Sequence, residues 1–281
     1  MSAHPPRSPL TRLEQEDTTL STSLVTRDGT VATVTLNRPD RRNALNETLK
    51  AALLEALTDV GTDETVRAVV LAAEGQAFCV GQDLAEHADR LSADGPAAAF
   101  ETVPNHYAPI VEALATMPKP VVAAVNGTCV GAGLGLALAC DLRVFAEDAT
   151  LGTAFTGIGL TCDSGLSATL TRSVGESRAR ELVLLGKTFT PADAVGWGIA
   201  GQIVPRADVH ATAARLAADF AAGPTVAFAE SKQLIAGALD RSFAATLRAE
   251  AEAQDRCGAT SDHRDAVNAF IRKSRPTFTG R

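Results

Sequence analysis

KPVVAAVNGTCVGAG, residues 119–133, is the most informative stretch of this 281-residue chain. Lys119-Pro120 ends a helical pattern, because the residue before a proline avoids the α conformation. Val121–Val125 is a short apolar run and predicts a buried strand. The glycines that follow predict a turn into a helix, where backbone N–H groups can face a ligand at the positive end of the helix dipole. The stretch therefore predicts a strand, a ligand-facing loop and a helix in that order.

A second glycine-containing loop stands earlier in the chain in the same setting. Ala68–Ala73 is another apolar run that predicts a buried strand, and the loop Phe78–Leu84 follows it. N–H groups from two such loops can converge as an oxyanion hole, which stabilises negative charge developing on a carbonyl oxygen. The alternative is that these glycines only permit close packing. The presence of two loops of one kind favours the oxyanion hole.

The pattern around these loops predicts an α/β fold, in which buried strands alternate with covering helices. Asp28-Gly29 lies between the alternating segments 20–26 and 31–37 and predicts a hairpin. Asn46 can cap a helix whose leucines fall on one face. The further predicted elements are a helix at 100–117, a strand at 143–146, and C-terminal helices at 206–222, 224–238, 241–257 and 261–273.

Length and composition fit one main domain with an appendage. Hydrophobic residues make up 46% of the chain and charged residues 21%, which excludes a fibrous or largely disordered protein. We divide the chain into a flexible N-terminal tail at 1–19, an α/β core at 20–190 and a helical C-terminal region at 191–281. The last region has few large apolar residues, so we expect it to pack on the core or on another subunit.

The charge and the side-chain inventory exclude several classes of function. The net charge is −7 and aromatic residues make up 4% of the chain, so neither nucleic acid nor an anionic membrane is an expected partner. The cysteines and histidines have no metal-ligand spacing, which predicts no metal site. The apolar runs are too short for a membrane span, and the N-terminus lacks the apolar stretch of a signal peptide. We therefore expect a cytoplasmic protein.

Several motifs, taken in order, resemble those of the crotonase superfamily of enoyl-CoA hydratases and isomerases. They are LNRP with RNAL (36–39, 42–45), AFCVGQDL (77–84), KPVVAAVNG with GAG (119–127, 131–133) and CDLR (140–143). The resemblance runs from about residue 20 to the C-terminus. It implies a crotonase-like spiral of ββα units, a helical C-terminal trimerisation region, and a homotrimer or dimer of trimers. It also implies an acyl-CoA thioester substrate, with no separate cofactor, whose carbonyl oxygen is held by the backbone N–H groups of Gln82 and Ala132.

The resemblance also indicates which acid takes part in the chemistry. In the hydratases two glutamates act on a water, and their positions correspond to Gly135 and Phe155, neither of which can transfer a proton. Hydration of a 2-enoyl-CoA is therefore disfavoured. Asp163 stands where dienoyl-CoA isomerases and other non-hydratase branches carry a catalytic aspartate, so we expect it to be the acid/base, with a pKa raised by its apolar surroundings. The alternative role for Asp163 is to cap the helix that begins near Gly165.

A narrower resemblance, to the ring-epoxide isomerases of aerobic phenylacetate degradation, rests on residues 79–84, 131–133, 155–163, 184–186, 194–198, 261–265 and 278–280. The chain departs from that branch at Cys162, where a proline is usual. His106 and Tyr107 fall on a helix that borders the acyl pocket in this family, but such residues more often finish the edge of a core, and we leave them out of the catalytic set. The resemblance implies that six residues bind CoA: Arg41, Arg42, Ala44, Asp83, Phe270 and Lys273. Phe270 and Lys273 would reach the CoA from a neighbouring subunit.

We therefore expect an acyl-CoA isomerase that shifts a double bond or rearranges a ring epoxide through a thioester enolate held in an oxyanion hole. Two alternatives stay open at this point. One is another crotonase-type reaction, by an enoyl-CoA hydratase-like enzyme or a hydrolase. The other is a catalytically silent acyl-CoA-binding protein, which would keep the oxyanion hole but exchange no α-proton.

Overall fold

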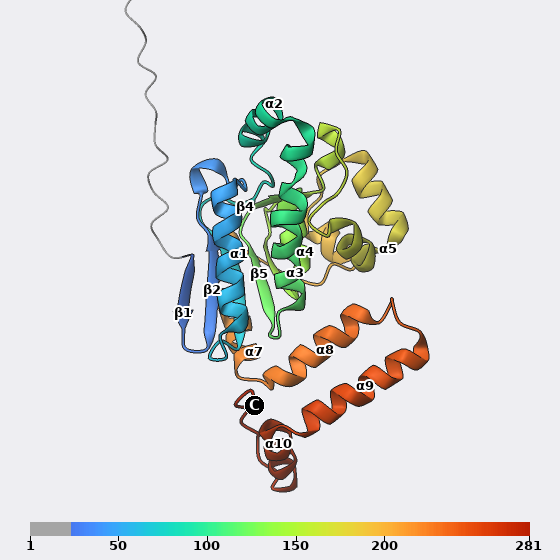
Figure 1. The fold of residues 1–281 in the computed structure, drawn as a ribbon. Coiled ribbons are helices and arrows are strands. Elements are labelled where there is room, and N and C mark those ends of the chain that lie inside the picture. The colour runs from blue at the N-terminus through green and yellow to red at the C-terminus, as the bar shows by residue number, and fades with distance from the viewer. Residues whose placement is uncertain (1–23) are drawn as a thin grey trace, which may run out of the picture.

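The computed structural model describes residues 24–281, so the predicted tail at 1–19 and residues 20–23 lie outside the described residues. The chain winds through successive units of strand, strand and helix (Figure 1). These units are β1 Val25–Asp28, β2 Val31–Leu36 and α1 Glu47–Thr62; β3 Ala68–Ala73, β4 Ala77–Cys79, α2 Leu84–Phe100 and α3 Ala108–Thr116; β5 Val121–Val125, β6 Thr128–Val130 and α4 Ala132–Ala139; and β7 Leu142–Ala146, β8 Leu151–Gly152 and α5 Leu166–Leu185. The chain then runs through α6 Pro191–Gly196, β9 Gln202–Val204, α7 Val209–Ala221, α8 Thr225–Gly237, α9 Phe243–Gly258 and α10 Ser261–Ile271.

The strands of residues 24–281 form two sheets. The larger is six-stranded, in the order β1-β2-β3-β5-β7-β9, and the smaller is three-stranded, in the order β4-β6-β8. β1 and β2 are antiparallel, and the later neighbours in the large sheet are parallel. From β3 onward, each unit gives its first strand to the large sheet and its second strand to the small one. This arrangement confirms the predicted α/β fold and the spiral of ββα units that the resemblance implies.

The large sheet has a buried core on each of its faces, because successive side chains on a strand point to opposite sides. On β3, Val69 and Leu71 join a core that includes the leucines of α1. Val70, between them, joins a second core formed with α7. Ala213 and Ala217 of α7 are fully buried there, and their small size lets the helix lie close to the sheet.

Most predicted elements coincide with observed ones. Asn46 caps α1, since its side chain accepts a hydrogen bond from Leu49 N at 3.0 Å. The helix predicted at 100–117 is observed as a π-helical turn, Val103–Tyr107, that runs into α3. β9 differs from the sequence prediction, because residues 202–204 lie in the region expected to be helical and instead pair with β7. The division at residue 190 stays a prediction, while β9 and α7 extend the packed part of the fold beyond it.

The last helices stand apart from the two sheets. Figure 1 shows α8 and α9 side by side below the sheets, with α10 at the end of the molecule opposite α2. Lys232 on α8 forms an ion pair with Asp141 at 2.9 Å, and Arg67 donates to the Phe278 carbonyl oxygen at 3.0 Å, so polar contacts tie this region to the core. None of the helices in the described range is both long and apolar enough to cross a membrane.

The first turn of α4 crosses β4 at very close range. A Cβ placed on Gly133 would lie 2.3 Å from the Cys79 carbonyl oxygen, which is closer than such atoms approach in proteins. Gly133 is therefore required for this crossing, which sets where the N-terminus of α4 lies relative to the loop after β4.

Replacing Gly133 with alanine is expected to lower the free energy of unfolding by about 1–3 kcal/mol, because α4 or β4 must shift to relieve the overlap. Gly258→Ala in α9 is the matched control, since a Cβ there would meet nothing within 4 Å. Gly258 is the last residue of α9 and does not have a positive φ, so alanine is tolerated there and the control is expected to be neutral or slightly stabilised. Urea unfolding followed by circular dichroism measures both, and equal midpoints would contradict the packing argument.

Candidate active site

A pocket of about 130 Å³ lies where the loops after β4 and β6 meet the loop before α5. Most of its wall is apolar. Gln82, Tyr107 and Asp163 are among the polar side chains that line it. The apolar part of the wall includes Leu84, Phe100, Val103, Phe155, Ile158 and Leu160.

The two glycine-containing loops converge at this pocket. A Cβ on Gly81 would lie 3.3 Å from the Ala132 backbone nitrogen, so the loops are in contact. Leu45 N–H donates to the Gly81 carbonyl at 2.8 Å and Asp83 N–H donates to the Leu45 carbonyl at 3.2 Å. These bonds use the groups on either side of Gln82, whose own N–H therefore points away from Leu45.

The Ala132 N–H is the first of helix α4 and has no acceptor within its own helix. Both N–H groups that the resemblance singles out thus belong to residues lining one pocket. Such a pair can stabilise an oxygen that gains negative charge.

Asp163 lies in the wall of the same pocket, half-buried, and accepts a hydrogen bond from the Ser164 hydroxyl at 2.7 Å. Ser164 has φ of 52°, an uncommon left-handed conformation for a residue other than glycine, and it turns the chain just before α5. Gly165 precedes α5 with no side chain capping the helix, so the Asp163 carboxylate does not act as the cap.

Burial raises the pKa of Asp163, and the Ser164 hydroxyl and the Lys50 charge oppose that rise. The carboxylate is therefore a better base than an exposed aspartate, and it shares a pocket with N–H donors that can hold a carbonyl oxygen.

The positions of the two hydratase glutamates are filled by packing. A Cβ on Gly135 would lie 2.7 Å from the Ser164 Cβ, so the loop that carries Asp163 occupies the space a side chain would need. Phe155 is buried in the pocket wall. The same contact therefore leaves no room for an acidic side chain at position 135 of α4 and holds the loop that carries Asp163.

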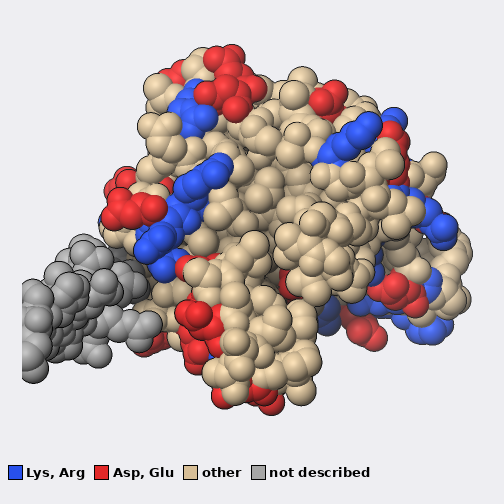
Figure 2. All heavy atoms as spheres, turned by 90° about the horizontal axis from the view of Figure 1, so that it is seen from above, with Lys and Arg blue, Asp and Glu red and all other residues tan. Residues whose placement is uncertain are grey.

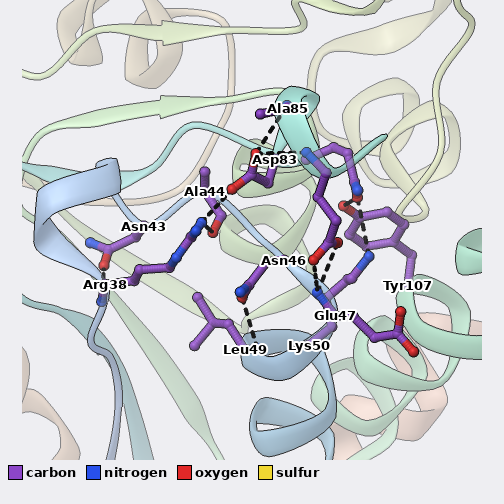
Figure 3. Close-up of polar contacts among 12 residues, drawn as sticks. Arg38, Asn43, Ala44, Asn46, Glu47, Leu49, Lys50, Asp83, Ala85 and Tyr107 are labelled. Carbon is purple, nitrogen blue, oxygen red and sulfur yellow. Dashed lines mark hydrogen bonds and ion pairs between the residues drawn. The ribbon is translucent and has the colours of Figure 1, made fainter. Parts of the chain in front are cut away.

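The predicted CoA-binding residues at the start of the chain lie near the pocket but have other partners. The Asp83 carboxylate pairs with Arg38 at 2.5 Å and accepts from Ala85 N at 3.0 Å, which makes it the cap of α2 (Figure 3). The Ala44 carbonyl also accepts from Arg38, at 3.1 Å. Arg38, which the sequence analysis did not single out, therefore ties the loop before α1 to the loop after β4.

Arg41 and Arg42 are exposed on the loop between β2 and α1, and Arg42 donates to the Thr128 hydroxyl at 3.2 Å. Around the end of the molecule where α2 lies, basic and acidic side chains stand beside one another along the rim, and the centre is largely uncharged (Figure 2). Phosphate groups bound on this face would therefore be held by individual side chains rather than by a broad positive field.

Phe270 and Lys273 are not brought to the pocket within one chain. Phe270 lies on α10, far from α2 in Figure 1, and both side chains are exposed. Their predicted role requires a neighbouring subunit, as the resemblance implies.

A buried cation that was not predicted from the sequence lies behind the pocket. The Lys50 ammonium donates to the Thr102 hydroxyl at 2.6 Å and to the Gln82 side-chain oxygen at 3.3 Å. Tyr107, set aside as an edge residue, donates its hydroxyl to the same Gln82 oxygen and lines the pocket. The burial of Lys50 could have been predicted from its position on the helix, because it shares the buried face of α1 with Leu49 and Leu53.

The chain is similar to known proteins over nearly its whole described length. It matches the family described as Enoyl-CoA hydratase/isomerase over residues 26–281. It is 38% identical to the 1,2-epoxyphenylacetyl-CoA isomerase of Escherichia coli (strain K12), over 89% of this chain and 95% of the relative. It is 33% identical to the 2,3-dehydroadipyl-CoA hydratase of the same strain, over 93% and 100%. A crystal structure from Mycobacterium abscessus, assigned to the enoyl-CoA hydratases/isomerases, is 48% identical with a TM-score of 0.87, over 92% of this chain and 100% of its own.

Asp163→Asn is expected to stabilise the folded protein at neutral pH. Because burial raises the pKa of Asp163, the folded state binds that proton more tightly than the unfolded chain, and ionisation of the carboxyl opposes folding. This penalty is absent below the ordinary aspartate range, near pH 4, and grows as the pH rises through the folded pKa. Melting temperatures of the two proteins between pH 4 and 8 should therefore diverge as the pH rises. A constant difference would show that burial of the charge is not the cause.

Proposed function

This chain belongs to the enoyl-CoA hydratase/isomerase family, the crotonase superfamily, and we propose that within it the protein is an acyl-CoA isomerase with Asp163 as its acid/base. The observation that carries the proposal is the placement of Asp163 in one pocket with Gln82 and Ala132, while packing excludes a side chain at Gly135. One carboxylate can remove a proton and return it elsewhere, whereas the family's hydration uses two to act on a water.

The proposed reaction moves one proton within the substrate. The Gln82 and Ala132 N–H groups hold the thioester carbonyl oxygen, which makes the hydrogens on the adjacent carbon more acidic. Asp163 takes one of these protons, and the C–H electron pair becomes an enolate whose charge rests on that oxygen. Asp163 then returns the proton to the far end of the conjugated system, and the double bond shifts. Oxidation states are unchanged overall, so the step needs neither a redox cofactor nor a metal.

The pocket supports an apolar or aromatic acyl group. Its volume of about 130 Å³ is near the roughly 150 Å³ of an apolar cavity that takes up benzene. Phe100 and Phe155 provide aromatic wall, and Leu84, Val103, Ile158 and Leu160 provide aliphatic wall. Together with the similarity to the 1,2-epoxyphenylacetyl-CoA isomerase, this supports a ring-bearing thioester, including a ring epoxide, as the substrate, and it supports a role in phenylacetate catabolism.

Hydration is the second candidate function, and the similarity to the 2,3-dehydroadipyl-CoA hydratase favours it. It would require Asp163 to act on a water without the two family glutamates. Analysis of the products separates the candidates, because a hydratase adds the mass of water to a 2-enoyl-CoA and an isomerase leaves the mass unchanged.

Asp163→Asn is expected to abolish exchange of the α-proton while leaving thioester binding intact, because the amide fills the same space but cannot act as a base. The loss should be at least about 100-fold, the lower end of what a positioned acid/base contributes. Deuterium incorporation from heavy water into 3-enoyl-CoA, 2-enoyl-CoA and phenylacetyl-CoA-type thioesters measures exchange by mass spectrometry. Calorimetry measures binding of the same thioesters.

Asp193→Asn is the matched control for this experiment. Asp193 caps α6 together with Thr190, is exposed and does not line the pocket, so its replacement should leave exchange unchanged. Binding without exchange in the wild type would refute the isomerase and support the silent acyl-CoA-binding protein. Normal exchange in Asp163→Asn would show that a residue other than Asp163 is the base.

We also propose that the protein assembles as a homotrimer or a dimer of trimers. The C-terminal helices support this, because their large apolar side chains are left in solvent in one chain. The most exposed of them, with 71–84% of their surface accessible, are Ile235, Leu239, Phe243, Phe270 and Ile271.

Light scattering is expected to give a mass three or six times that of the 29.1 kDa chain. Phe243→Glu, which places a charge on an 80% exposed apolar residue, should lower that mass. A monomeric wild type would exclude the assembly and, with it, the predicted roles of Phe270 and Lys273.

A further inference from the structure

We propose that Lys50 is a positioning residue of the pocket, which fixes the Gln82 side chain from behind and places its ammonium group beside the proposed oxyanion hole and Asp163. The inference rests on the proposed function and deepens it. The residues concerned are called the Lys50 cluster and are Lys50, Gln82, Thr102 and Tyr107.

The cluster joins separate parts of the chain at the pocket wall. Gln82, Thr102 and Tyr107 line the pocket, whereas Lys50 approaches them from α1 and is 2% exposed. Its ammonium lies 5.3 Å from the centre of the Tyr107 ring, and Figure 3 shows the two side chains directed toward one another. The Gln82 side-chain oxygen thus accepts from both Lys50 and the Tyr107 hydroxyl.

These contacts restrain the residue that carries a proposed oxyanion donor. With its terminal oxygen held by two donors, the Gln82 side chain cannot rotate freely, and its Cα and backbone N–H are held with it. A hydrogen-bond donor that is already in place stabilises a developing negative charge most strongly, because the protein does not have to reorganise during the reaction.

The cost of placing Lys50 here argues against a purely structural role. A lysine is seldom fully buried, and burial lowers its pKa. Lys50 also lies within about a turn of the N-terminus of α1, where the helix dipole disfavours a cation. Lys50 in this location therefore lowers the stability of the helix and loses the solvation of its charge.

Lys119 shows what a structural buried lysine looks like in the described chain. It is 4% exposed, and its ammonium donates to the Val60 and Asp63 carbonyl oxygens, both at 2.9 Å. These carbonyls lie at the end of α1, where a cation is favoured. Lys50 differs because its hydrogen-bond partners are side chains of the pocket wall rather than backbone groups at a helix end.

The charge of Lys50 acts on Asp163 as well as on the bound oxygen. Lys50 lowers the pKa of Asp163, against the effect of burial. Tyr107 and Cys162 also interact with Asp163, and both stay neutral because burial raises their pKa. His87 is a further titratable group in the lining of the same pocket. Around Lys50 itself stand Glu47 on its own helix, Glu86 and Arg90 on α2, and His106 beyond Thr102.

The test compares wild type, Lys50→Met and the matched control Lys119→Met for α-proton exchange across pH. Lys50→Met should lower kcat by about tenfold or more with little change in KM, as loss of oxyanion stabilisation does. It should also move the acid limb of the rate profile to higher pH, because Asp163 loses a neighbouring positive charge. Lys119→Met should lower the melting temperature and leave both kinetic features in place.

A folded Lys50→Met with wild-type kcat and an unshifted acid limb would overturn the proposal. If Lys50→Met does not fold, Tyr107→Phe decides, since it removes the second donor to Gln82 and leaves the charge. It should lower kcat and leave the acid limb unmoved, and an unchanged kcat would overturn the positioning role. Absence of exchange in the wild type would instead mean that the proposed function has failed, so the two failures are told apart.

Discussion

The site depends on the close crossing of α4 over β4, where Gly133 leaves no room for a Cβ beside the Cys79 carbonyl oxygen. This contact fixes the N-terminus of α4 against the strand that leads into the Gln82 loop. The two backbone N–H groups lie at one pocket because backbone packs directly on backbone, without side chains as spacers. A donor pair built in this way is as rigid as the fold itself, which is what preorganised stabilisation of a developing charge requires.

The same helix also limits which acid the pocket can contain. Two residues after Gly133, Gly135 packs on Ser164, and the loop that carries Asp163 fills the space where a longer residue on α4 would project. The carboxylate in the pocket wall is thus on a loop rather than on the helix, and Ser164 of that loop has a left-handed conformation. Strained backbone of this kind persists only where surrounding contacts enforce it, and here it sets the direction of a carboxylate. The packing and the choice of chemistry are therefore linked.

Local patterns in the sequence were sufficient for β1, β2, β3, β5 and β7 and for the two glycine-containing loops. The role of Asp163 came from the family resemblance instead, because the residues around it alone favoured a helix cap. Apolar runs such as Val121–Val125 and the glycines after them are local features with one physical interpretation. Lys50 was missed because a lysine next to Leu49 is ordinarily taken as solvated, and only the three-dimensional contacts with Thr102 and Gln82 show where its charge lies. β9 was missed because a three-residue strand pairing at a sheet edge has almost no local signal.

Charges inside the protein are costly, and the fold carries two of opposite sign at one pocket. Asp163 is half-buried and Lys50 is buried, so each alone would lower stability. Together they reduce one another's cost, since each charge favours the ionised form of the other. The Coulomb attraction between them weakens when solvent enters the pocket and strengthens when an apolar acyl group excludes it. An apolar group that fills the pocket would therefore strengthen the attraction between Asp163 and Lys50, which is the electrostatic arrangement that the proposed enolate would require.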